Sequence, residues 1–223
     1  MNSAARTLPF GFIRRALVPL VIIVSAVLVP ATLAAQDSSL LKDKVEFDGK
    51  DGKEIFRLDP EGPEAELQAA GGRKTLATFA KKERVITVEL PKSDDLSTVT
   101  VDAKKTKFTF ADPAGKTRWV LEREPDGDWE LFDGARKLKL ELKHKDYGYK
   151  IVDGADDETE KGRVKKKEDK ISLRNAKGDE VIRTKDTTNA LAAGCFLLEG
   201  LSLTEKAAFA VAILVFEPDT SGE

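Results

Sequence analysis

The chain has very few of the side chains on which catalysis and metal binding most often depend. Its 223 residues include one cysteine, Cys195, and one histidine, His144. A single cysteine excludes an intrachain disulfide. A single histidine leaves a zinc site or a Cys–His pair without recognisable partners. Glycine-rich phosphate loops and the G-x-S-x-G and H-E-x-x-H motifs are also missing. We therefore predict a non-enzymatic protein without a catalytic residue, a cofactor or a metal site.

The few candidate reactive residues lie in sequence contexts that favour structural roles. Cys195 lies in an apolar segment, whereas a reactive thiolate needs a nearby cation or base, so we predict a buried structural cysteine. His144 follows Leu142 by two residues in an alternating segment and is expected at the end of an inward face. Residues 153–160 hold five acids in eight positions but lack EF-hand spacing, which predicts a solvated loop.

The sequence also has no excess of positive charge. Its formal net charge is −2, and it becomes −5 without residues 1–35, which hold three arginines and no acid. Dedicated nucleic-acid binders normally carry a basic excess, so no nucleic-acid partner is predicted.

Residues 1–35 have the composition of an export signal. Arg6, Arg14 and Arg15 precede an apolar run over 16–34, which ends in small residues before a polar segment. This pattern predicts a signal peptide cleaved after Ala34 or Ala35. An uncleaved N-terminal anchor is the alternative, because the apolar run approaches the length that spans a bilayer. Both readings place the rest of the chain outside the cytoplasm, in the periplasm or the extracellular space.

Between residues 44 and 184 the sequence reads as short strands separated by turns. Residues 137–142 (KLKLEL) alternate apolar and charged side chains, and D-G, P-A-G and K-G turn signals separate similar segments. Nine segments stand out as strand candidates: 45–47, 54–58, 84–88, 98–101, 107–110, 118–121, 137–142, 147–152 and 170–173. The spacing predicts roughly a dozen strands in a mainly β fold.

Three hairpin-like segments recur with equal spacing. Their turn glycines are Gly52, Gly115 and Gly178, which are 63 residues apart. Hairpin turns always favour glycine and aspartate, so chance similarity is one explanation. The equal spacing favours a sheet that is built from related units.

The last apolar segment predicts a buried helix. Ser202 and Glu205 form a capping box, ten apolar residues follow from Ala207, and Pro218 ends the segment. A helix over 203–216 would be apolar on every side and too short to cross a membrane. We predict that it lies inside a closed β-barrel of roughly twelve strands over 44–217, with 36–43 as a linker and 218–223 as a frayed tail. Its predicted core residues are Phe209, Val211, Ile213, Leu214 and Phe216.

These segments resemble the phospholipid scramblase branch of the tubby-like superfamily. The resemblance rests on the C-terminal segment and on two turns. In the C-terminal segment these are the leucines Leu201 and Leu203, the pair Lys206-Ala207, the apolar run 208–215 and the final pair Phe216-Glu217, and the turns are 51–53 and 112–116. It implies a barrel of about twelve strands around a C-terminal helix, and association with membrane lipid. Gly200 and Ser202 stand where the scramblases carry calcium-binding acids, and Cys195 is the only cysteine, so neither calcium binding nor lipidation is implied for this chain.

Basic side chains are the main candidates for binding. Those expected on outward faces of neighbouring strands are Lys137, Lys139, Lys143, Lys145, Arg163, Lys165 and Lys167. If the strands pair, these residues form a stripe for anionic lipid headgroups or an envelope polymer, although acids within it are also compatible with an ordinary solvated face. We therefore predict an exported binding or structural protein of a bacterial cell envelope. A carboxylate-based secreted hydrolase and an inhibitor or adhesin that binds a protein are the alternatives.

Overall fold

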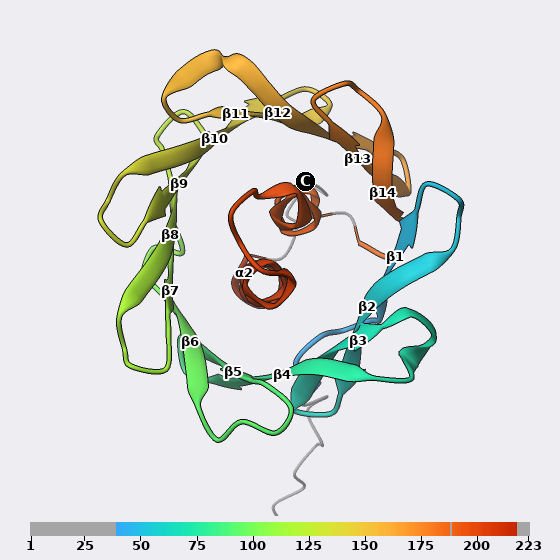
Figure 1. Ribbon diagram of the computed structural model, residues 1–223, viewed down its shortest axis with the longest axis vertical. Coiled ribbons are helices and arrows are strands. Elements are labelled where there is room, and N and C mark those ends of the chain that lie inside the picture. The colour runs from blue at the N-terminus through green and yellow to red at the C-terminus, as the bar shows by residue number, and fades with distance from the viewer. Residues whose placement is uncertain (1–38, 188, 218–223) are drawn as a thin grey trace, which may run out of the picture. The chain divides into compact units, whose positions relative to one another are not determined.

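A closed antiparallel β-barrel encloses two short helical segments in the computed structural model, which describes residues 39–187 and 189–217 (Figure 1). Each strand pairs with the next along the chain, and β14 pairs with β1. The strands are β1 (Val45–Gly49), β2 (Glu54–Glu61), β3 (Glu64–Ala69), β4 (Thr75–Lys82), β5 (Val85–Glu89), β6 (Leu96–Val101), β7 (Lys107–Ala111), β8 (Thr117–Arg123), β9 (Trp129–Asp133), β10 (Leu138–Lys145), β11 (Gly148–Asp153), β12 (Asp156–Lys167), β13 (Lys170–Asn175) and β14 (Glu180–Thr184).

The barrel and its mainly β character confirm the prediction, but the strand count of about twelve was wrong, because the barrel has 14 strands. β3 and β4, joined by the short 3-10 helix η1 (Ala70–Gly72), were not among the strand candidates. Their sequences EAELQA and TLATFAKK are rich in alanine, glutamate and lysine, which strands disfavour. Pairing with both neighbours nevertheless makes them strands.

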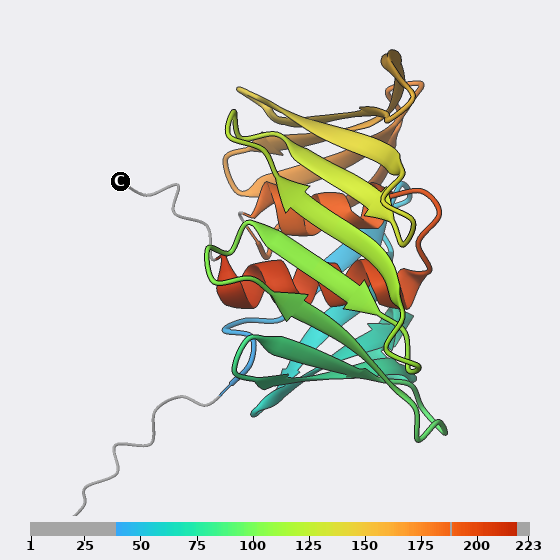
Figure 2. The same ribbon diagram turned by 90° about the vertical axis from the view of Figure 1, so that its left-hand side faces the viewer.

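The interior of the barrel is filled by α1 (Ala190–Gly194), the 3-10 helix η2 (Cys195–Leu197) and α2 (Leu203–Phe216). Figure 2 shows the strands tilted across these segments. α2 contacts β4, β5, β6 and β7, while α1 contacts β11, β12 and β13. The interior of a barrel widens with strand number, and a single helix would leave one side of this wide barrel unfilled. The second helical segment was not predicted.

α2 has the bounds and the capping box that were predicted. The Ser202 hydroxyl accepts a hydrogen bond from the Glu205 N–H at 3.3 Å, and the Glu205 carboxylate accepts one from the Ser202 N–H at 2.7 Å. Of the predicted core residues, Phe209, Val211, Ile213 and Phe216 are buried, while Leu214 is only partly buried. No helix in the described ranges is both long and apolar enough to cross a membrane.

The two inner helices are tied together at both ends. The Asn189 side chain caps α1 by accepting from the Ala192 N–H at 2.9 Å, and its amide donates to the carbonyl of Glu217, at the end of α2, at 2.8 Å. At the opposite end, Lys206 Nζ lies 3.2 Å from the carbonyl oxygen of Phe196. These polar contacts fix one helix against the other where apolar packing alone is not directional.

The strand pairing repeats with the 63-residue spacing of the turn glycines. The hairpins β1–β2, β7–β8 and β13–β14 each contain a bulge that skips one residue, and the skipped residues Ile55, Arg118 and Val181 are 63 apart. Leu76 in β4 and Lys139 in β10 are bulged at the same spacing. We therefore divide the wall into a first unit (β1–β6), a second unit (β7–β12) and a third unit (β13–β14).

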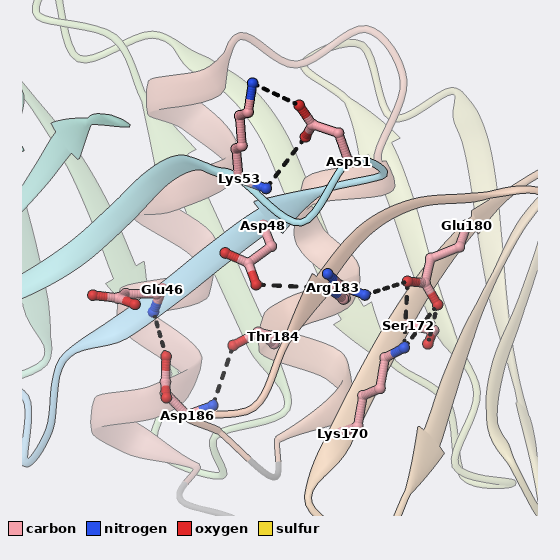
Figure 3. Close-up of polar contacts among 10 residues, drawn as sticks. All are labelled: Glu46, Asp48, Asp51, Lys53, Lys170, Ser172, Glu180, Arg183, Thr184 and Asp186. Atoms are coloured by element: carbon pink, nitrogen blue, oxygen red, sulfur yellow. Dashed lines mark hydrogen bonds and ion pairs between the residues drawn. The ribbon is translucent and has the colours of Figure 1, made fainter. Parts of the chain in front are cut away.

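The barrel closes where the third unit meets the first, and this seam is short. Only Asp48 and Gly49 of β1 pair with β14, opposite Arg183 and Ile182. Figure 3 shows Arg183 between the carboxylates of Asp48 and Glu180, at 3.7 and 3.8 Å. Beyond the last pair, the Asp186 carboxylate accepts a hydrogen bond from the Glu46 N–H at 2.8 Å, in place of a strand partner. Side chains thus complete a seam that has few backbone pairs.

Candidate functional site

Four cations lie side by side on the outer wall of the second and third units. The register pairs Lys143 of β10 with Lys150 of β11, Lys150 with Arg163 of β12, and Arg163 with Arg174 of β13. The residues next to them along each strand, Leu142, Ile151, Val164 and Leu173, are buried in the core. Since side chains alternate along a strand, the four cations face outward. We call Lys143, Lys150, Arg163 and Arg174 the basic row.

The predicted stripe is only partly assembled by the fold. β10 and β12 do not pair directly, because β11 lies between them. Lys143 and Arg163 belong to the basic row, and Lys145 and Lys165 lie one step further along the same strands, on either side of Gly148. Lys137 and Lys139 lie towards the other end of β10, and Lys167 pairs with Lys170 at the end of β12. That any of these residues binds a ligand stays a prediction.

Lys150 and Arg174 are the two members that were missed in the sequence. β10 and β11 are joined by the two-residue turn Asp146-Tyr147, which pairs Lys145 with Gly148 and therefore Lys143 with Lys150. A two-residue turn fixes hairpin register, so this turn was a signal for Lys150. Arg174 had the same kind of signal, because the two-residue turn Glu168-Asp169 pairs Lys167 with Lys170 and therefore Arg163 with Arg174.

The wall from β4 to β7, in the first unit and at the start of the second, carries the same row without charge. Ala80 pairs with Thr87, Thr87 with Thr98, and Thr98 with Ala111. Ala80, Thr87 and Ala111 precede Lys143, Lys150 and Arg174 by 63 residues, and Thr98 occupies the place of Arg163 between its neighbours. We call these four residues the neutral row. The same barrel wall is therefore built at β4–β7 from small and polar residues and at β10–β13 from four cations.

Carboxylates neutralise part of the basic row. Lys143 Nζ lies 3.0 Å from Asp157 and 3.3 Å from Glu141, and the hydrogen bond to Asp157 raises the pKa of Lys143. Arg163 Nη2 lies 2.7 Å from Glu160, whose carboxylate raises the pKa of Arg163. Lys150 has no ion pair among the described residues, and Arg174 donates to the carbonyl of Gly178 at 2.8 Å. Two of the four cations are thus without a carboxylate partner in the described part of the chain.

An acidic row lies beside the basic row. Glu122 of β8 pairs with Glu130 of β9, which pairs with Glu141 of β10. Burial raises the pKa of Glu130, and so do the neighbouring carboxylates of Glu124, Glu141 and Glu122. Arg136 and Lys107 lie 2.9 and 3.6 Å from Glu122, at one end of the acidic row. Lys143 lies 3.3 Å from Glu141, at the other end. The wall therefore carries opposite charges in adjacent rows.

A small pocket lies next to the seam. Its volume is about 250 Å³, and Leu214 of α2 and Val45 of β1 contribute to its lining. The remaining lining residues are Leu40, Leu41, Lys42, Asp43, Asp186 and Thr187. Pockets for small molecules usually exceed 300 Å³. Leu41 is buried in the core, so the part of the predicted linker that is described packs against the barrel.

Cys195 and His144 lie in the structural environments predicted from their sequence context, whereas residues 153–160 differ in part from the prediction. Cys195 is fully buried, its Sγ faces the carbonyl of Leu191 at 3.5 Å, and burial raises the pKa of the thiol. His144 is exposed beyond the inward-facing Leu142, and its ring packs edge-on against Tyr149. Residues 153–160 form the β11–β12 turn and the exposed start of β12, whereas a loop was predicted throughout.

In the described ranges, no three or more His, Cys, Asp or Glu side chains are grouped so that they could hold a metal ion. The segments predicted as a signal or anchor (1–35) and as a frayed tail (218–223) lie outside the described residues. Comparisons with protein-family models, curated proteins and solved structures found no match to this chain. The resemblance to the tubby-like superfamily therefore stays a prediction, and the 14 strands and second inner helix differ from the barrel that it implies.

Proposed function

We propose that this chain is an exported, non-catalytic binding protein of the cell envelope, and that it binds an anionic partner through the basic row. The single observation that carries the proposal is the contrast between the basic row and the neutral row. Like charges directly opposite each other on neighbouring strands destabilise a sheet. The neutral row indicates that this wall folds without them. Residues that violate a local rule of stability in this way are typical of functional sites.

The core supports a surface function. Two helices and the inward side chains of 14 strands fill the barrel, so the interior offers little space for a ligand. The outer wall is therefore the surface on which we expect binding. Export is proposed from residues 1–35, and the mass of the protein recovered from the envelope distinguishes a cleaved signal from a retained anchor.

The decisive variant replaces the basic row by the neutral row, as Lys143→Ala, Lys150→Thr, Arg163→Thr and Arg174→Ala. Each residue introduced already occupies the matching position in the same barrel. We expect unchanged or slightly raised thermal stability and loss of salt-sensitive binding to immobilised polygalacturonate or to vesicles containing phosphatidylglycerol. Affinity chromatography and vesicle co-sedimentation at low and high salt measure this.

The control variant removes four exposed lysines elsewhere, Lys50, Lys104, Lys116 and Lys177, by substitution with alanine. It makes the same change in net charge but leaves the basic row intact, so we expect most of the binding to remain. Equal loss of binding in both variants would show a general charge effect and contradict the proposal. So would the absence of binding to both anionic supports by the unmodified protein.

The two alternatives have less support. Glu124 and Glu130 are close carboxyl groups of the kind that a hydrolase uses, but Glu130 faces outward from the convex wall and not into a pocket. A protein-binding module was expected to dock through a long free strand edge or an apolar patch. In residues 39–187 and 189–217 every strand has a neighbour on both sides.

A further inference from the structure

The direction of the basic row restricts the kind of anion that fits it. Its four cations come from four successive strands, so the row runs around the barrel and not along one strand. Neighbouring strands are about 4.8 Å apart, so the row spans about 14 Å. Resting on the proposed function, we infer that the basic row binds a linear acidic polysaccharide, with one carboxylate on each sugar, that lies across β10–β13.

The spacing of the charges favours this ligand. An extended glycan with one carboxylate per sugar repeats its charge at a distance close to one strand spacing. Its neighbouring carboxylates point to different sides of the chain, and the long Lys and Arg side chains of the row can reach around it to meet them. Phosphates in a polyphosphate chain lie closer together and would crowd between neighbouring cations. Arg163 and Arg174 carry planar guanidinium groups, which match carboxylates in two-point contacts. Lys143 and Lys150 add charge with less demand on geometry.

The curvature of the wall disfavours a membrane as the partner. The row covers three of the 14 strand-to-strand steps, or about a fifth of the way around the barrel. A flat bilayer meets such a convex wall best along a narrow line, so Lys143 and Arg174, at the two ends of the row, lie further from it than Lys150 and Arg163. A flexible polymer can follow the wall and reach all four cations.

The surroundings of the row also indicate on which side the polymer lies. Glu141 and Glu160 flank one side and repel carboxylates. On the other side, Lys145 and Lys165 alternate with Gly148 and Ser172, and two of these four side chains are small. Positive charge is therefore favourable for an anion near Lys145 and Lys165, whereas Glu180 lies 2.8 Å from Ser172 at the β13 end. Exposed ion pairs such as that of Lys143 with Asp157 contribute little to stability, so a ligand carboxylate can replace them.

The test measures binding of galacturonic acid as the monomer, dimer, tetramer and octamer by calorimetry, with the protein obtained from the full chain. The tetramer is the shortest of these that can meet all four cations. We expect affinity to rise steeply up to the tetramer and little beyond it, and to fall with salt because bound counterions are released. Each cation of the row that is removed should weaken tetramer binding about five-fold, and the neutral-row variant should weaken it at least about a hundred-fold.

A neutral glucan tetramer, inorganic polyphosphate and vesicles with phosphatidylglycerol are the comparison ligands. Binding to the vesicles but not to the tetramer would overturn this inference and leave the proposed function standing. Equal affinity for monomer and tetramer, or tighter binding of polyphosphate, would also overturn it. Binding to none of the anionic ligands would contradict both. Tetramer binding that the neutral-row variant loses and the four-lysine control keeps would support both.

Discussion

Phe209 and Leu214 show how differently two apolar residues of one helix contribute to the fold. Phe209 has no exposed surface, and its ring centroid lies 6.3 Å from that of Phe110 in the wall. Leu214 lies on the same helix but lines the pocket beside the seam. The sequence predicted both as core residues, because an apolar run shows which residues are hydrophobic but not which of them line a pocket.

Replacement of these two residues by alanine should have unequal effects. We expect Phe209→Ala to lower the free energy of unfolding by about 3–5 kcal/mol, because it removes a buried ring and leaves a cavity. Leu214→Ala should cost at most about 2 kcal/mol, since part of its side chain is already solvated. Urea unfolding followed by circular dichroism measures both. Equal losses would contradict the position of Leu214 at the pocket.

The basic row shows which residue-level information a single sequence contains. Lys143 and Arg163 were identified from their alternation within a strand, which indicates a face. Which cations become neighbours depends on pairing between strands, and periodicity within one strand does not contain that information. Comparison of the basic row with the neutral row was needed to distinguish it from an ordinary solvated face.

At the scale of elements, α2 was predictable and the α1–η2 segment was not. Ser202 and Glu205 mark the start of α2, and the apolar run that follows is long enough to indicate a buried helix. α1 has only five residues, which is too short for helical periodicity to be visible. The position of α1 depends on Asn189, whose side-chain amide donates a hydrogen bond to the carbonyl of Glu217 at the end of α2.

The two caps should therefore differ in their contribution. Ser202→Ala removes an exposed cap and should lower the free energy of unfolding by about 1 kcal/mol. Asn189→Ala removes a buried cap and also leaves the Glu217 carbonyl without its donor, so we expect a loss of about 2–3 kcal/mol. Thermal unfolding of the two variants in parallel provides the comparison. If Asn189→Ala cost no more than Ser202→Ala, the link between the helices would be negligible.

At the scale of the whole molecule, the seam is where the barrel depends most on side chains. Burial would raise the pKa of Glu180, but hydrogen bonds from Ser172 and Lys170 and the charge of Arg183 outweigh it, so the pKa is lowered (Figure 3). A carboxyl group whose pKa is lower in the folded state stabilises that state above its unfolded pKa of about 4.5. This stabilisation is lost as the pH falls through the folded value.

Glu180→Gln should accordingly destabilise the barrel at neutral pH by about 1 kcal/mol, since the side chain is partly buried but still reached by solvent, which screens its ion pairs. At about pH 3 the difference from the unmodified protein should shrink, because Glu180 is then becoming protonated in both states. Melting temperatures at the two pH values test this. Glu61→Gln, an exposed carboxylate of β2, serves as the control. A difference between Glu180→Gln and the unmodified protein that does not change with pH would contradict the role of Glu180 in the seam.

The third unit contains only two strands, and this has a consequence for how such a protein can change. Each hairpin added or lost between β14 and β1 would alter the circumference by two strands while leaving every other pairing in place. A wider barrel would need a third inner helical segment to fill it, and a narrower one would need only one. Gene segments that encode hairpins and those that encode the inner helical segments would therefore have to evolve together.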